Sequence, residues 1–133
     1  LRSIYDREHA AFGKTPNRFG MIMTEAAYSG GQEWLDQLMH YLEKNKSLFT
    51  NALKSLNNVK VFDLESTYLA WVDFSQLDIT ELKLKDMLIK EAGVAPSFGS
   101  GFGKNSEKFA RFNIACRTEI LDLAVNRLTK TFL

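Results

Sequence analysis

The hydrophobic residues between positions 29 and 58 repeat with the period of an α-helix. Large apolar side chains recur every three or four residues and form an amphipathic stripe several turns long. The stripe consists of Trp34, Leu35, Leu38, Leu42, Phe49, Leu53 and Leu56. Ser29 and Gln32 have the spacing of a capping box, and the pair Asn57–Asn58 offers a stop. The pattern therefore predicts one long helix over 29–58.

Two runs typical of β-strands follow, at 59–64 and 66–75. Both are rich in β-branched and aromatic residues, and only a short acidic break separates them. In the second run the alternating positions are Tyr68, Ala70, Val72 and Phe74 against Leu69, Trp71 and Asp73. Because side chains alternate across a strand, one of these sets should meet a layer of helices. We therefore predict a hairpin with helices packed on one face.

The rest of the chain predicts two further helices, a short strand before the glycine-rich loop and a strand after it. Thr80 can cap a helix that ends at Gly93, and a second helix is expected over 118–132. Their core-facing positions are Leu84, Leu88 and Ala92 in the first helix and Leu121, Val125, Leu128 and Phe132 in the second. The clustered glycines at 99, 101 and 103 predict a loop, and FARFNIA at 109–115 predicts a strand.

The order of elements is helix, two strands, helix, short strand, loop, strand and helix. This order predicts an α+β fold, a two-layer α/β sandwich in which a small mixed or antiparallel sheet has its helices on one side. Residues 1–28 differ, because MIMTEAAY at 21–28 is apolar yet precedes a pair of glycines. We therefore expect residues 1–28 to be the remnant of another domain or a linker, and residues 29–133 to form the sandwich.

Composition narrows the possible partners. At 133 residues, of which 45% are hydrophobic, the chain can bury one core and has room for one domain. Its 17 basic and 16 acidic side chains leave a net charge of +1 without charge blocks, so nucleic acid is not an expected partner. No stretch approaches the roughly 18 to 20 apolar residues of a membrane helix, so no membrane partner is expected. One cysteine, Cys116, fits the reducing cytoplasm.

Three features suggest chemistry but have a simpler structural interpretation. The stretch SFGSGFGK offers amides beside a lysine, yet it lacks phosphate-loop spacing and leads into a strand. His9 and His40 lack the spacing of metal ligands, so no metal site is predicted. Cys116, between a strand and a helix, is more typical of a small packed residue than of an activated thiol.

Arg111 is the strongest candidate for a binding residue. It lies in the strand FARFNIA among uncharged neighbours and shares a face with Phe109 and Asn113. A desolvated guanidinium without a partner costs several kcal/mol, so an acceptor is required. Two partners remain open here: an Asp or Glu of the chain itself, which the residues alone favour, or the carboxylate of a ligand, which suits the planar fork of arginine.

Four segments together resemble a known family. The ordered set NRFGMIMTEAAYSGGQEWLDQL, STYLAWVDFS, EAGVAPSFGSGFG and FARFNIACRTEIL resembles the C-terminal third of class I/II, fold-type I enzymes that use pyridoxal phosphate (PLP). The resemblance points to the branch of cystathionine β-lyases (C–S β-lyases) that stands beside the aminotransferases, and it spans nearly the whole chain. The family usually has proline in place of Phe98, alanine in place of Gly101 and a Pro-Arg pair in place of Arg117-Thr118.

The resemblance implies a site and a cofactor. It assigns the α-carboxylate of an amino-acid substrate to Arg111 with Asn113, and this reverses the preference for an internal salt bridge. It places Asn17 close to the PLP site, and it makes Tyr68 and Trp71 packing residues. It further implies a homodimer or self-association, and either β-elimination or transamination as the reaction of the full-length enzyme.

The same resemblance implies that this chain alone is not a catalyst. The lysine that bonds to PLP and the acidic partner of its ring lie upstream in the family, and no lysine here matches the Ser-x-x-Lys context. We therefore assign no catalytic residue and expect PLP in the full-length enzyme but not bound to this chain. The alternative is a stand-alone α+β binding or interaction module without PLP chemistry.

Overall fold

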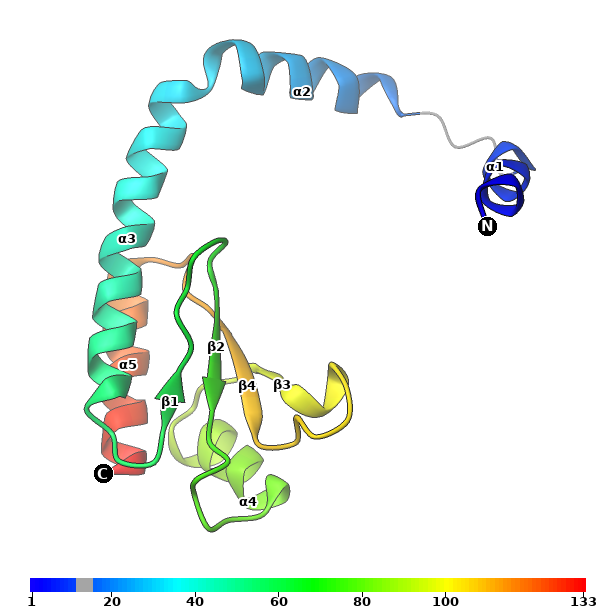
Figure 1. Ribbon diagram of the computed structural model, residues 1–133. Coiled ribbons are helices and arrows are strands. Elements are labelled where there is room, and N and C mark those ends of the chain that lie inside the picture. Colours follow the sequence, from blue (N-terminus) through cyan, green and yellow to red (C-terminus); the bar gives the residue numbers. More distant parts are fainter. Residues whose placement is uncertain (12–15) are drawn as a thin grey trace. The chain divides into compact units, whose positions relative to one another are not determined.

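The computed structural model describes residues 1–11 and 16–133, and its elements are drawn in Figure 1. Residues 12–15, which belong to the expected remnant, lie outside the described residues. The chain divides into two compact units, Leu1–Leu38 and Met39–Leu133. The division lies inside a helix, α3 Gln32–Lys54, whereas the sequence places a boundary after residue 28.

The first unit contains α1 Arg2–Ala11 and α2 Arg18–Gly30. The side chain of Asn17 caps α2 by accepting a hydrogen bond from the amide of Gly20 at 2.7 Å. None of the residues of α1 and α2 is buried within the described part of the chain.

The predicted capping box at Ser29 and Gln32 is wrong. Ser29 lies within the last turn of α2, so its backbone is already helical and cannot begin a new helix. Gln32 instead donates a hydrogen bond from Nε2 to Oδ1 of Asp36 at 2.9 Å, one turn further along α3. The sequence pattern did not predict α2. Because α2 extends to Gly30, Ser29 is a residue inside this helix.

The second unit contains a four-stranded antiparallel sheet in the order β1-β2-β4-β3 (Figure 1). The strands are β1 Lys60–Val61, β2 Leu69–Asp73, β3 Ser97–Phe98 and β4 Phe109–Asn113. The predicted hairpin is confirmed, since β1 pairs with β2 and places Val61 opposite Val72. The long strand β4 lies between β2 and β3, which gives it a partner on both edges.

The two helices after the hairpin follow their sequence signals closely. α4 Glu81–Asp86 starts at Thr80, whose Oγ1 accepts a hydrogen bond from the amide of Lys83 at 3.2 Å. It continues as a π-helical turn, Met87–Glu91, and Gly93 then takes the left-handed conformation with φ of +66°. α5 Thr118–Phe132 has the predicted bounds.

The core lies between the helices and one face of the sheet. Its sheet side is formed by alternate residues of β2 and β4, and its helical side by α3, α4 and α5. The fully buried side chains include Phe49, Leu53, Val72, Phe74, Leu84, Leu88, Ala110, Ile114 and Leu128. The predicted α+β sandwich is therefore confirmed, and its sheet is antiparallel throughout.

The hydrophobic stripe of α3 is buried only along its second half. Phe49 and Leu53 are 1% exposed, whereas Trp34 is 67% exposed. The buried turns belong to the second unit, and the exposed turns belong to the first. A periodic stripe predicts which face of a helix is apolar, but it does not predict whether another element covers that face.

Candidate functional site

Arg111 lies on the face of the sheet opposite the core. Along β4, Ala110 and Phe112 are buried, whereas Phe109, Arg111 and Asn113 are partly or fully exposed. This alternation is the one that the sequence predicts for a strand. The residues paired with Arg111 on the neighbouring strands are Trp71 of β2 and Ser97 of β3. Arg111 is therefore held by a strand that is paired on both sides.

The guanidinium of Arg111 has few polar contacts. Its Nη2 donates a long hydrogen bond of 3.5 Å to Oγ of Ser97, and its central carbon lies 4.6 Å from the centre of the Phe102 ring. Its Nε is buried and has no hydrogen-bond partner within the described residues. Among these residues no ion pair includes Arg111. A guanidinium donates strong hydrogen bonds to a carboxylate when one comes within reach.

Asn113 lies two residues further along the same face. Its Oδ1 accepts a hydrogen bond from the amide of Ala115 at 2.9 Å, which fixes the side chain at the end of β4. Its side-chain NH₂ group is a donor that this bond does not use. Arg111 and Asn113 thus offer donors on one exposed side of the strand.

The glycine-rich loop supplies the ring of Phe102. It forms β3 and a short 3₁₀ turn, Gly99–Gly101, and then leads into β4, the strand that the sequence predicts after it. A Cβ on Gly99 would lie 1.9 Å from the carbonyl oxygen of Ser106, so only glycine permits this approach. The turn closes with a hydrogen bond of 2.8 Å from the amide of Phe102 to the carbonyl of Gly99.

The start of α4 contacts the same loop through a carboxylate. Glu81 forms an ion pair with Lys85 at 2.5 Å. The hydrogen bond from Lys85, followed by one from Ser100, lowers the pKa of Glu81 below its ordinary value, because both donors favour the charged carboxylate. The side chain of Glu81 is therefore ionised at neutral pH and connects α4 to the loop.

Asn17 belongs to the first unit and Arg111 to the second. Asn17 is exposed, and it lines a depression on α2 together with Gly20, Met21 and Tyr28. Its side-chain oxygen serves as the helix cap, and this leaves the NH₂ group as its donor.

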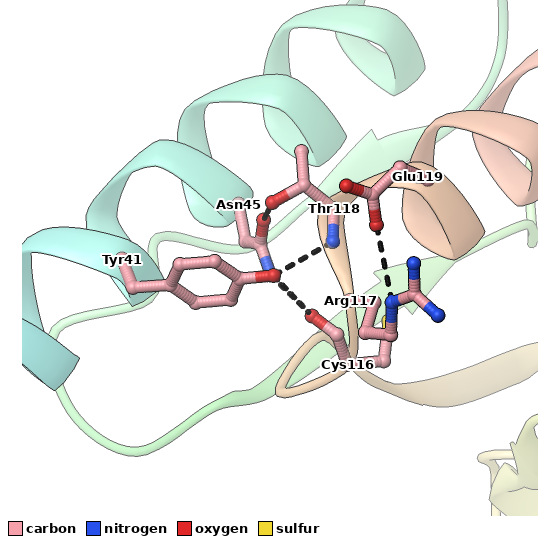
Figure 2. Close-up of polar contacts among 6 residues, drawn as sticks. All are labelled: Tyr41, Asn45, Cys116, Arg117, Thr118 and Glu119. Atoms are coloured by element: carbon pink, nitrogen blue, oxygen red, sulfur yellow. Dashed lines mark hydrogen bonds and ion pairs between the residues drawn. The ribbon is translucent and has the colours of Figure 1, made fainter.

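A second polar cluster, which the sequence patterns did not predict, joins α3 to the connection between β4 and α5 (Figure 2). Asn45 is completely buried, and its Nδ2 donates to the carbonyls of Ile114 and Cys116, both at 2.9 Å. Its Oδ1 accepts a hydrogen bond of 2.8 Å from Oγ1 of Thr118. One polar residue inside an apolar stripe gives no periodic signal, so its role emerges only from the tertiary fold.

Tyr41 completes this cluster one turn earlier on α3. Its hydroxyl accepts a hydrogen bond of 2.7 Å from the amide of Thr118, an orphan donor at the start of α5, and donates one of 3.3 Å to the carbonyl of Cys116 (Figure 2). Arg117, at the cap position, makes no capping bond and pairs with Glu119 at 3.4 Å. The cluster therefore fixes the end of β4, close to Asn113.

Cys116 and His9 lie outside β4, the strand that carries Arg111. Cys116 is half-buried and packs against the core, and the ring of His9 stacks on that of Tyr5 at 5.6 Å. Among residues 1–11 and 16–133 no group of three His, Cys, Asp or Glu side chains could hold a metal. In the same residues no helix is long and apolar enough to cross a membrane.

Comparison with known proteins relates the chain to PLP enzymes. It is 34% identical over 113 residues to the cystathionine β-lyase PatB of Bacillus subtilis, covering 84% of this chain but 29% of the relative. It matches the PLP-bound C–S lyase of Staphylococcus hominis with a TM-score of 0.79 at 28% identity, over 100% of this chain and 35% of that one. A PLP-bound structure assigned as an aminotransferase, from Clostridium difficile, gives 0.81 at 31% identity, over 99% and 35%.

No protein-family model matches the chain. The chain spans about three tenths of the length of the curated relatives that it matches.

Proposed function

Since this chain is homologous to the C-terminal small domain of PLP-dependent cystathionine β-lyases and aminotransferases, we propose that it binds the α-carboxylate of an amino-acid substrate. Arg111 is the residue that we assign to the carboxylate, and Asn113 is its neighbour on the same face. The enzyme as a whole would act on amino acids, either by β-elimination at a carbon–sulfur bond or by transamination.

The observation that carries this proposal is the buried Nε of Arg111 without a partner. A structural arginine would meet an Asp or Glu of its own chain, and no ion pair of Arg111 occurs among the described residues. A carboxylate bound to the guanidinium would supply the charged acceptor that Arg111 lacks among the described residues. The NH₂ group of Asn113 could donate to the same ligand.

The surroundings of Arg111 support a role toward the substrate and not toward the cofactor. PLP supplies the electron sink for reactions of amino acids, and it requires a bonded lysine, an acid beside its ring and donors for its phosphate. No contact of the Arg111 side chain involves a lysine or an acid among these residues. We therefore propose that PLP is held by other parts of the longer enzyme, with Asn17 as a neighbouring residue, and that the chain alone is inactive.

The first unit supports a proposal about association. Its exposed large apolar side chains in α2 include Phe19, Met21, Ile22, Met23 and Tyr28. Exposed apolar surface of this kind is typical of contact surfaces between domains or subunits. We propose that it is covered in a homodimer or by self-association, and that the protein works in the cytoplasm, as its single thiol suggests.

Binding of L-cystathionine to the purified chain tests the assignment of Arg111. We expect Arg111→Leu to weaken binding at least about tenfold, since charge-assisted hydrogen bonds to the carboxylate are lost. Arg117→Leu is the matched control, because Arg117 is an exposed arginine that pairs with Glu119 at the start of α5. Equal affinities in all three proteins, measured by calorimetry, would contradict the proposal.

Borohydride treatment with PLP tests the expectation that the chain has no cofactor lysine. We expect no lysine to be labelled in preference to the others, as judged by peptide mass spectrometry. Stable labelling of a single lysine, together with production of keto acid from L-cystathionine, would show that this chain holds the cofactor itself. Amino-acid binding that is equally strong in Arg111→Leu, without any such labelling, would favour the stand-alone binding module.

A further inference from the structure

The face of the sheet that carries Arg111 also carries a continuous row of aromatic rings. Phe62 contacts Phe109 with 6.4 Å between ring centres, and Phe109 stacks on Trp71 at 5.7 Å with 20° between the planes. Trp71 then meets Phe102 edge to face at 5.3 Å and 89°. The row ends at Arg111, whose guanidinium lies over the ring of Phe102.

Phe102 is oriented from two directions. The edge-to-face contact with Trp71 is a favoured arrangement of two aromatic rings. The backbone hydrogen bond from Phe102 to Gly99 holds the base of the side chain, and the close approach of Gly99 to Ser106 holds the turn against the start of β4. The ring is therefore fixed although it is 50% exposed.

The guanidinium has few other restraints. Its one hydrogen bond, to Ser97, is long, and its Nε has no partner among the described residues. An arginine side chain loses considerable rotamer freedom when it becomes fixed, and this loss opposes binding. A ring that covers one face of the guanidinium restricts its rotation and does not cover the N–H groups, which lie in the plane of the guanidinium.

We propose that Phe102 is a positioning residue that holds the guanidinium of Arg111 ready for a carboxylate, with Trp71 as its support. The ring does not touch the carboxylate in this proposal, which rests on the assignment of Arg111 in the proposed function. The sequence of the glycine-rich loop does not predict this role. The loop places the ring of Phe102 against Arg111 of β4.

The test uses the intact chain and L-alanine as the probe. We expect Phe102→Leu to weaken binding of L-alanine about three- to tenfold, because a cation–π contact and the preorganisation that it provides are lost. Phe102→Tyr retains the ring and should bind within about twofold of the natural chain. Phe62→Leu is the control, since Phe62 lies at the other end of the aromatic row.

A spectroscopic readout separates positioning from a loss of stability. In nitrogen-15 NMR spectra, the Nε–H resonance of Arg111 should be displaced by the ring current of Phe102, should move in Phe102→Leu and should return in Phe102→Tyr. The urea midpoints of both variants should equal that of the natural chain. Unchanged affinity and an unmoved resonance in Phe102→Leu would overturn the proposal.

The outcome for Arg111→Leu distinguishes the two levels of inference. If the natural chain and Arg111→Leu bind L-alanine equally, the proposed function fails, and the role of Phe102 fails with it. If Arg111→Leu loses binding while Phe102→Leu keeps it, only the positioning role of Phe102 is wrong.

Discussion

On one face of the β2–β4 pair the central side chains are buried, whereas on the other face they are half exposed. The first face includes Val72 and Phe112, which are 0% and 5% exposed. The second includes Trp71 and Arg111, which stand opposite each other in the register. The same two strands therefore provide the packing surface of the domain and the platform of its candidate site.

The two faces contribute differently to folding stability and to ligand binding. On the core face, burial of apolar area supplies the stabilisation, and each ring contacts others. On the site face, the Nε of Arg111 is left without a partner, which opposes folding unless a ligand binds. We therefore expect substitutions on the first face to lower stability and substitutions on the second to lower affinity.

The largest effect on stability should come from Phe112→Ala. Phe112 contacts the rings of Phe49 and Phe74, with ring centres at 5.3 and 6.5 Å. Its truncation should lower the free energy of unfolding by about 3–5 kcal/mol, since it leaves a cavity in the core. Urea denaturation followed by circular dichroism measures this. The control Phe62→Ala lies on the other face, and a loss as large there would contradict the comparison.

The next effect should come from Asn45→Leu, which removes the cluster that fixes the end of β4. The carbonyl oxygen of Ile114 would lose the donor that Asn45 supplies, and that of Cys116 would keep only the hydroxyl of Tyr41, at a cost of about 1–3 kcal/mol in the free energy of unfolding. Asn51→Leu, at an exposed position of the same helix, is the control and should change stability little. Equal urea midpoints for the two variants would show that the cluster contributes nothing.

A smaller effect, with the opposite sign, is expected for Arg111→Leu. Because the Nε of Arg111 is buried without a partner, its replacement should leave stability unchanged or raise it by up to about 1 kcal/mol. Thermal denaturation in the absence of ligands measures this. A marked loss of stability would mean that Arg111 has a structural partner, and it would remove the difference between the two faces.

The smallest effect should be that of Glu81→Gln, and it should depend on pH. The pKa of Glu81 is lowered in the folded chain, so its carboxylate stabilises the fold above the ordinary carboxyl pKa of 4.5. This contribution is lost as pH falls through the lowered value. Melting temperatures should therefore differ between the natural chain and Glu81→Gln at pH 7, and the difference should shrink as the pH falls below 4.5. A difference that persists in acid would contradict this origin.

The sequence predicted the second unit better than the first. Features that depend on neighbouring residues in the chain were predicted correctly. They include the cap at Thr80, the left-handed conformation of Gly93 and the bounds of α5. The capping box at Ser29 failed because α2, which the pattern did not predict, extends through that residue. The exposed turn at Trp34 has the same periodicity as the buried turns of α3, so periodicity alone could not separate them.

The candidate site was predictable only in part. Alternation along β4 placed Arg111 and Asn113 on one face, as expected. The contact of Arg111 with Phe102 depends on how the glycine-rich loop folds against β4, and the contacts of Asn45 join residues far apart in the chain. Neither has a signal in local spacing, because both arise from tertiary packing.

The central claim is that the guanidinium of Arg111 binds a carboxylate, and one NMR titration tests it most directly. The Nε–H resonance of Arg111 is followed while L-alanine is added, and then in a second experiment with L-alaninamide, which lacks the carboxylate. The account predicts a saturable shift with L-alanine and none with the amide. No shift with either ligand, or the same shift with both, would contradict it.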